Sequence, residues 1–360
     1  MNIWEDKTIE FLYEYLNSSA PVSYETSGQK VWLNYLKQYI SEWDQDQYGT
    51  VYGVINPGQE FKVVIEAHAD EISWYVNHIS DDGYIGVIRN GGSDHLIATS
   101  RKIVIHGKEG PVTGVFGWPA IHVRRGKDAT NLTPKLENIF IDVGAKNKDE
   151  VLEMGIHVGA VAAYADELHL INDQFYTGRA LDNRMGGFAI SQVARLVAEN
   201  KIELPYTLYI VNAVQEEIGL RGAQMIAHRL NPDIAIVTDV THDTSTPLIQ
   251  ARKEGDIRCA RGPVVTYAPA VHNNVLDLVI STAEEKEIPF QRSASSRSTG
   301  TDTDAFAFSR DGIPSCLISL PLRYMHTTVE MSHKDDIENL IKLMYETLLK
   351  ITPDFKLTYM

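Results

Sequence analysis

After residue 178 the chain alternates between short apolar runs and amphipathic segments, and this alternation constrains the fold more than any other feature. The runs YTLYIVNAV (206–214), DIAIVTDV (233–240) and PSCLISLP (314–321) have the length and continuous apolar character of buried strands. The segments NRMGGFAISQVARLVAEN (183–200) and RGAQMIAHRL (221–230) carry apolar residues at helical spacing. Strands that alternate with helices predict an α/β fold with a mostly parallel central sheet flanked by helices.

The first part of the chain extends this pattern, and the middle part interrupts it. Residues 8–21 and 29–40 have helical spacing, and FKVVIEAHAD (61–70) reads as an apolar strand with a polar end. From residue 72 to residue 161, short β-like runs are separated by Gly, Asp and Asn turns. These runs are YIGVIRN, RKIVIHG and NIFIDVG. We therefore predict a discontinuous α/β domain, residues 1–71 and 162–360, interrupted by a small β-barrel or sandwich at residues 72–161.

The C-terminal helix carries its own start signal. Ser332 with Asp335 three residues later resembles a capping box, and an apolar stripe follows from Ile337 to Leu348. We expect Ser332 to cap this helix.

Composition narrows the class of protein. With 360 residues and 44% hydrophobic composition, the chain can bury a sizeable core. Its formal net charge of −15 disfavours duplex nucleic acid and anionic membranes as partners. The sequence lacks both an apolar run of about 18 residues and a signal-peptide pattern at its start. The sequence contains only two cysteines, Cys259 and Cys316, which favours a reducing, cytoplasmic location. The short basic segment RRGKD (124–128) is interpreted as a solvated turn.

Polar side chains gather where the predicted strands end. His68 and Asp70 follow one apolar strand, Glu216 and Glu217 follow a second, and Asp239 ends a third. In open α/β sheets, ligands bind at the carboxyl ends of the strands. The sequence therefore predicts that these five side chains lie together at the carboxyl edge of the sheet.

Two further residues extend this set. Asp182 lies at the start of a predicted helix, and His326 follows the strand-and-turn LISLPLRYM.

Each of these residues also has an ordinary structural reading. His68 and His326 are compatible with a hydrogen-bonded and a surface histidine, Asp182 with a helix cap, and Asp239 with a turn. Glu216 and Glu217 are compatible with a solvated turn. Their common position at strand ends favours a functional set over these separate explanations.

Imidazole and carboxylate groups together suit Zn²⁺ and similar divalent ions, and the lack of clustered cysteines argues against a structural zinc site. His68, Asp182, Glu217, Asp239 and His326 are five candidate ligands, enough for two ions that share one carboxylate. Consecutive residues leaving a strand diverge, so Glu217 can bind an ion while Glu216 acts as a base towards water. Asp70, two residues after His68, is expected to orient that imidazole.

With these residues in place, the chain resembles the cytoplasmic di-metal aminopeptidases. That family includes glutamyl and deblocking aminopeptidases and the tetrahedral (TET) aminopeptidases, and some members carry the label endoglucanase. The similarity runs over nearly the whole chain. It is carried by six motifs: EAHADEIS, GRALDNRMGG, VQEEIGLRGA, TDVTH, GTDTDAFAFSRDGIP and LPLRYMHTTVE.

The resemblance implies a role for each ligand. It makes Asp182 the bridging ligand, with His68 and Asp239 completing one site and Glu217 and His326 the other. Glu216 would be the general base, and Asp70 would orient His68.

The resemblance also implies a fold and an assembly. The fold would be a Zn-peptidase-like core with an inserted β-domain used in dimer contacts, and homodimers would assemble into a homododecamer. Two divalent ions, Zn²⁺ or Co²⁺, and peptide substrates are implied as well. Asp304 and Thr328 depart from the family pattern near the site, which leaves the substrate preference open.

Four residues are weaker candidates for contacts with substrate. Arg179 flanks Asp182, but packing at the start of a helix is the favoured explanation for it. His272 lies in CARGPVVTYAPAVHNN, where an ordinary loop histidine is the alternative. Thr301 and Asp302 either reach the site or simply end a loop.

The sequence thus predicts an enzyme, a dinuclear metallo-aminopeptidase that removes N-terminal residues from peptides. A deacylase of small N-acyl compounds is the enzymatic alternative, because the same centre can hydrolyse any accessible amide. A non-catalytic metal-binding scaffold is the alternative from another class, and it is disfavoured because a base accompanies the ligands. Glycoside hydrolysis fits poorly, since it calls for two carboxylates without surrounding metal ligands.

Overall fold

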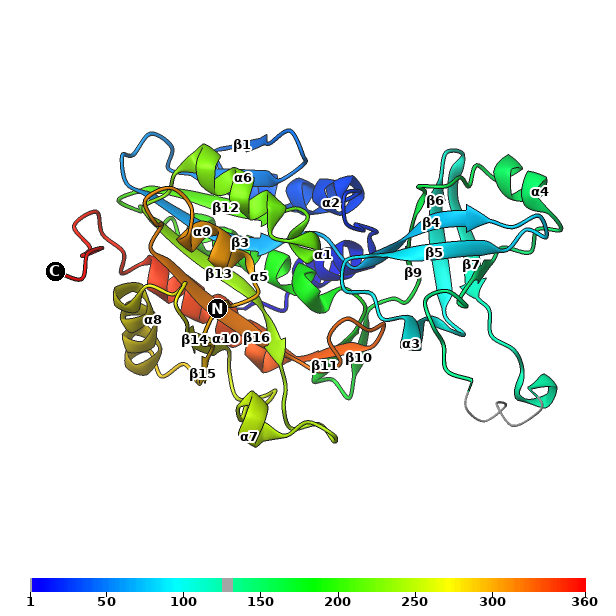
Figure 1. The fold of residues 1–360 in the computed structure, drawn as a ribbon. Coiled ribbons are helices and arrows are strands. Elements are labelled where there is room, and N and C mark those ends of the chain that lie inside the picture. Colours follow the sequence, from blue (N-terminus) through cyan, green and yellow to red (C-terminus); the bar gives the residue numbers. More distant parts are fainter. Residues whose placement is uncertain (1, 125–131) are drawn as a thin grey trace.

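An eight-stranded sheet forms the centre of the larger part of the molecule, as seen in a computed structural model that describes residues 2–124 and 132–360 (Figure 1). Its strands lie in the order β1 (Glu42–Gln45), β2 (Val51–Ile55), β12 (Thr207–Ala213), β3 (Lys62–His68), β13 (Ile234–His242), β16 (Ser315–Leu322), β14 (Val264–Tyr267) and β15 (Gln291–Ala294). The four central strands, β12, β3, β13 and β16, run parallel, which confirms the predicted sheet.

Helices cover both faces of this sheet, which explains why its central strands are apolar on both sides. α5 (Leu181–Glu199) packs on β3 and β13, and α1 (Asp6–Asn17), α2 (Thr26–Leu36) and α10 (Lys334–Leu348) pack on α5 or beside it. α8 (Asn273–Glu285) lies next to α10. α6 (Arg221–Leu230) and α9 (Asp302–Ala307) lie together on the near face in Figure 1. The described helices include none with the length and hydropathy needed to cross a bilayer.

The predicted β-barrel is present as a separate closed unit at the right of Figure 1. Its strands follow one another in the order β4 (Ser73–Ile79), β5 (Ile85–Asn90), β8 (Ile141–Asp142), β7 (Gly110–Phe116), β6 (Lys102–Gly107) and β9 (Val161–Tyr164). It has its own buried core, which includes Trp74 and Phe116.

The barrel differs from the sequence prediction in detail. Within NIFIDVG only Ile141–Asp142 forms a strand, and β9 extends past the predicted boundary at residue 161. Most of RRGKD lies outside the described residues. The described chain also contains the short α-helices α3 (His95–Ala98), α4 (Lys148–Glu153) and α7 (Ala251–Glu254) and three 3₁₀ helices, η1 (Lys37–Tyr39), η2 (Ile121–Val123) and η3 (Glu216–Ile218).

A small three-stranded sheet lies between the two units. It consists of β10 (His169–Ile171), β11 (Phe175–Gly178) and β17 (Glu330–His333), all antiparallel. In its register Gly178 is opposite Glu330. The sheet therefore brings the segment before α5 next to the segment that follows His326.

The predicted cap of the last helix is wrong. Ser332 belongs to β17, and its hydroxyl donates to the carbonyl of Pro321 at 3.2 Å. His333 is the N-cap of α10 instead, and its Nδ1 accepts the backbone N–H of Asp335. The strand pairing of residues 330–333 with β11 shifts the helix start by one residue.

Candidate metal centre

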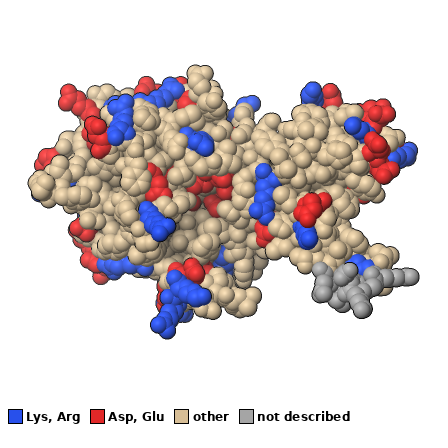
Figure 2. Space-filling view, in the orientation of Figure 1, with Lys and Arg blue, Asp and Glu red and all other residues tan. Residues whose placement is uncertain are grey.

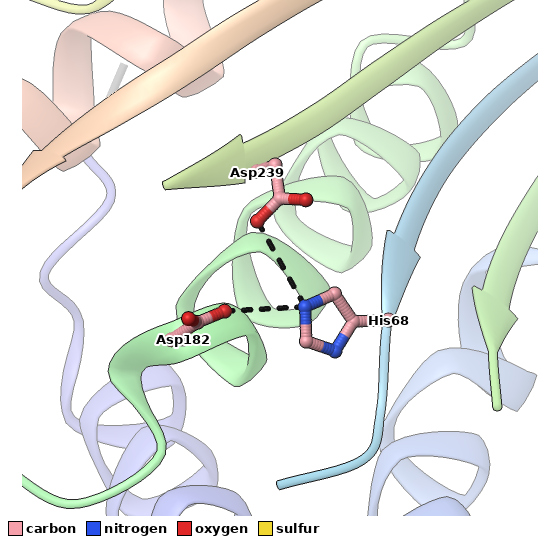
Figure 3. A group of neighbouring side chains, drawn as sticks. All are labelled: His68, Asp182 and Asp239. Carbon is pink, nitrogen blue, oxygen red and sulfur yellow. Dashed lines mark hydrogen bonds and ion pairs between the residues drawn. The ribbon is translucent and has the colours of Figure 1, made fainter. Parts of the chain in front are cut away.

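Three of the predicted ligands meet at the carboxyl edge of the parallel strands (Figure 3). His68 is the last residue of β3, Asp239 lies three residues before the end of β13, and Asp182 lies at the start of α5. His68 Nε2 is 3.2 Å from Asp182 Oδ1 and 3.8 Å from Asp239 Oδ1. All three side chains are buried.

A second group of three lies beside the first and shares Asp182 with it. His326 Nε2 is 3.2 Å from Asp182 Oδ2 and 3.4 Å from Glu217 Oε2. Asp182 therefore presents one oxygen to each imidazole. The five side chains come from five segments that are far apart in the sequence.

Residues with left-handed backbone conformations orient several of these side chains towards the cluster. Gln215, with φ 58°, turns the chain directly after β12, so that Glu216 and Glu217 leave the strand in a tight 3₁₀ turn. His326 itself has φ 61°, and Ala180, with φ 56°, precedes Asp182. These turns are the local reason why the three loops deliver side chains inward.

The structural alternatives for two ligands do not describe what is seen. Asp182 has non-helical backbone angles, and its two oxygens face imidazoles rather than the N–H groups of α5. Asp239 is not a turn residue, because β13 continues to His242. The Asp239 carboxylate also accepts the N–H of Val240 at 2.7 Å.

The predicted base, Glu216, and the residue predicted to orient His68, Asp70, flank the candidate ligands. Asp70 is fully buried, with its Oδ1 3.5 Å from His68 Nδ1, on the side of the imidazole away from the cluster. It also accepts the backbone N–H groups of Glu216 and Glu217 at 3.0 and 3.1 Å. Glu216 Oε2 is 3.8 Å from His68 Nε2, at the edge of the cluster rather than within either group of three.

The electrostatics of the cluster show an excess of negative charge. Burial raises the pKa of Glu216 to about 11, and the carboxylates of Asp239, Asp302 and Glu217 add to this effect against the opposing charge of His68. Burial likewise raises the pKa of Asp239 to about 7. Carboxylates crowded in a buried site resist ionisation unless cations lie among them.

The histidines respond to the same field in the opposite direction. Burial lowers the pKa of His326, but hydrogen bonds with Asp182 and Glu217 outweigh it and raise the pKa to about 11. The pKa of His68 is also raised well above its usual value, since Glu216, Asp182 and Asp70 outweigh the effect of burial. The surrounding potential thus favours positive charge at both sites.

The donor set fits two divalent ions of the Zn²⁺ type. Each group offers one imidazole and two carboxylates, the mixture that zinc and its relatives accept. With metal–ligand bonds of about 2.0–2.1 Å, tetrahedral geometry places neighbouring donor atoms roughly 3.3 Å apart. Three of the separations within the two groups, 3.2, 3.2 and 3.4 Å, match this spacing, and the fourth, between His68 and Asp239, is longer at 3.8 Å.

The two groups of candidate ligands open into a cavity of about 580 Å³ that reaches the surface. Figure 2 shows acidic side chains at the centre of a hollow on this face. Thr301 lines this cavity, as does the Ser298–Gly300 loop next to it. Asp302 is buried, and burial together with the nearby carboxylate of Glu66 raises the pKa of Asp302 well above its usual value. The structure therefore brings Thr301 to the cavity, whereas Asp302 is buried and does not line it.

Arg179 and His272 lie elsewhere. Arg179 is buried and paired with Glu71, and it donates to the carbonyls of Asn17 and Ser18. These contacts correspond to packing at the start of α5, which was the alternative to a contact between Arg179 and substrate. His272 stacks on Tyr359 with ring centroids 4.5 Å apart and lines a different cavity, near the C-terminus.

Sequence reasoning missed two buried carboxyl groups around the centre. Glu330 accepts backbone N–H groups from two ligand residues, Asp182 and His326. Glu66, on β3 two residues before His68, faces Asp302. A glutamate inside an otherwise apolar strand was a usable signal for Glu66, whereas Glu330 follows a turn and has no comparable signal.

A mostly parallel α/β sheet with an inserted closed barrel is the fold that this chain shares with solved aminopeptidases. The sequence pattern of the M42 glutamyl aminopeptidase family matches residues 49–343. The chain is 31% identical to the lysyl aminopeptidase of Pyrococcus furiosus, over 96% of this chain and 97% of that relative. It is 30% identical to the glutamyl aminopeptidase of Lactococcus lactis, over 76% of each.

Solved structures agree with these relatives. The TET aminopeptidase of a marine-sediment thaumarchaeote superposes with a TM-score of 0.92 at 27% identity, over 98% of this chain and 99% of that one. The chain belongs to the M42 glutamyl aminopeptidase family and is a peptide hydrolase.

Proposed function

We propose that the protein is a dinuclear metal-dependent aminopeptidase that removes single residues from the N-termini of peptides. The observation that carries this proposal is the position of Asp182, whose two oxygens each lie 3.2 Å from the imidazole of a different ligand group. A carboxylate in this position is suited to bridge two ions. Zn²⁺ or Co²⁺ fits the imidazole and carboxylate donors best.

The ligands would be His68, Asp182 and Asp239 for one ion and Asp182, Glu217 and His326 for the other. Bound ions would supply Lewis-acid polarisation of the scissile carbonyl and acidify the attacking water. Glu216, beside the cluster but outside both ligand groups, would act as the general base towards the attacking water and would return the proton to the leaving amine. The acidic cavity favours the cationic N-terminus of a peptide.

The test is the substitution Glu216→Gln, which removes the base and keeps the size of the side chain. We expect turnover of a peptide or an aminoacyl-anilide to fall at least about 100-fold, the usual contribution of general base catalysis. The zinc content measured after dialysis should equal that of the parent. Glu153→Gln, an exposed change on α4, is the control and should leave both quantities unchanged.

Two outcomes would count against this function. Unchanged turnover in Glu216→Gln would remove that residue from the mechanism. Faster cleavage of N-acetylated substrates than of substrates with a free amine would favour the deacylase alternative.

For assembly, we propose homodimers that combine into a homododecamer. A TET1 peptidase structure that contains a dodecamer superposes with a TM-score of 0.83 at 25% identity. The outer face of the barrel also exposes apolar side chains, including Ile88 on β5 and Val115 on β7, which suits a subunit contact. Light scattering after size-exclusion chromatography measures the mass of the assembly and tests this proposal.

The free, buried Cys259 and Cys316 support the expected cytoplasmic location.

A further inference from the structure

Glu330 lies where two ligand-bearing loops meet. It is the first residue of β17 and is opposite Gly178 on β11, four residues before Asp182. It also ends the loop that carries His326, and backbone hydrogen bonds between Arg323 and Met331 close the base of that loop. The strand pairing therefore brings one carboxyl group to both loops.

Both oxygens of Glu330 are used at this junction. Oε2 accepts the backbone N–H of Asp182 at 3.1 Å, and Oε1 accepts the backbone N–H of His326 at 2.7 Å. The side chain is 2% exposed. A buried carboxyl group with two such partners exchanges poorly for water, so the two loops are held at a fixed separation.

We propose that Glu330 is a positioning residue that holds Asp182 and His326 at the separation the second ion requires, and this inference rests on the proposed two-ion centre. Two of the three ligands in the group Asp182–Glu217–His326 depend on this single carboxylate. In the other group, His68 and Asp239 are placed by β3 and β13 themselves. The loss of Glu330 should therefore weaken one ion site more than the other.

The test is the substitution Glu330→Gln, followed by titration of metal-free protein with Zn²⁺ in a calorimeter. The amide keeps one acceptor oxygen but places an NH₂ group against the second N–H, so one of the two loops is released. We expect one of the two binding steps to lose about 10–100-fold in affinity, the usual cost of removing a group that orients a metal ligand, and the other step to change by less than about threefold.

The chain offers a matched control in Asp336. Its buried carboxylate also accepts two backbone N–H groups, from Ala260 at 2.6 Å and Gly262 at 2.7 Å, but neither belongs to a ligand-bearing loop. Asp336→Asn should lower thermal stability and leave both zinc-binding steps as in the parent. A purely structural role for Glu330 predicts the same behaviour in Glu330→Gln.

The outcomes separate the inference from the proposed function. Parent protein that binds fewer than two Zn²⁺ ions contradicts the two-ion function and the inference with it. Two ions in the parent and unchanged steps in Glu330→Gln, or equal losses in both steps, overturn the role of Glu330 alone. Should Glu330→Gln not fold, Glu330→Asp, which keeps the charge but shortens the reach, is titrated instead and decides by the same criteria.

Discussion

Asp70 accepts the backbone N–H of Glu216 at 3.0 Å while the same oxygen lies 3.5 Å from the imidazole of His68. One carboxylate thus sets the position of the proposed base relative to a proposed ligand. The next N–H, that of Glu217, is held by the other oxygen of Asp70 at 3.1 Å. The two adjacent glutamates are therefore fixed at the backbone before any ion binds, which leaves their side chains free to take different roles.

From this arrangement we expect Asp70→Asn to lower kcat by about 10–100-fold with little change in KM. The amide removes the negative charge facing His68 and places a donor against one of the two N–H groups. Steady-state kinetics on one aminoacyl-anilide, together with zinc content, provide the measurement. A change confined to KM would contradict this role, because it would indicate a contact with substrate instead.

Metal binding should release protons and strengthen as the pH rises. The pKa of His326 is raised to about 11, mainly by hydrogen bonds with Asp182 and Glu217 that outweigh burial, and that of His68 is raised well above normal. His326 is therefore expected to be protonated at pH 6–8 before an ion binds, and the shift in the pKa of His68 acts in the same direction. An ion must displace these protons, so affinity should rise by roughly tenfold per pH unit for each proton released.

Calorimetry with Zn²⁺ in two buffers of different ionisation enthalpy counts those protons directly. Affinity that is independent of pH, with equal heats in both buffers, would show that the imidazoles are already neutral.

The sequence predicted the sheet, the barrel and the set of residues that meets at the centre. It could do so because apolar runs indicate strands, and polar residues that follow them indicate the carboxyl edge of the sheet. It could not predict which backbone groups hold that set in place. The role of Glu330 depends on the pairing of β17 with β11, two segments separated by about 150 residues, and turn sequences carry no such pairing information. The same pairing made Ser332 a strand residue rather than a helix cap.

A different carboxylate, Asp243, should stabilise the segment after β13. It is buried, forms an ion pair with Arg323 at 2.8 Å, and accepts N–H groups from Ser245 and Cys259. Burial alone would raise its pKa, but these hydrogen bonds outweigh it and hold the pKa of Asp243 well below its usual range. Because the folded pKa is depressed, the stabilisation is present above the unfolded pKa of about 3.9 and is lost as the pH falls through the folded value.

Asp243→Asn should therefore lower the free energy of unfolding at pH 7 by about 1–3 kcal/mol. The difference in the free energy of unfolding between the variant and the parent should stay constant between pH 6 and 8 and become smaller below about pH 5. Guanidinium titrations at fixed metal concentration measure it. Asp256→Asn, at an exposed ion pair with Arg258, is the control and should change stability by less than about 0.5 kcal/mol. An equal loss in both variants would argue against a special role for Asp243.

The cavity over the centre should disfavour acidic N-terminal residues. Among the described residues its lining contains no lysine or arginine, and besides the metal-site carboxylates it contains Asp304. Asp304 accepts the backbone N–H groups of Thr299 at 2.9 Å and Gly300 at 3.0 Å, so its charge is held at the wall of the cavity. A carboxylate at this wall repels an acidic substrate side chain and attracts a basic one.

A panel of aminoacyl-anilides, assayed with added Zn²⁺, Co²⁺ or Mn²⁺, checks this expectation. We expect kcat/KM to be higher for lysyl- than for glutamyl-anilide. Asp304→Asn should reduce that ratio by roughly 3–10-fold, since one partly screened charge is removed while an acceptor oxygen remains for the Thr299–Gly300 loop. A preference for the glutamyl substrate in the parent, or a ratio that Asp304→Asn leaves unchanged, would mean that groups other than Asp304 determine which side chain the cavity accepts.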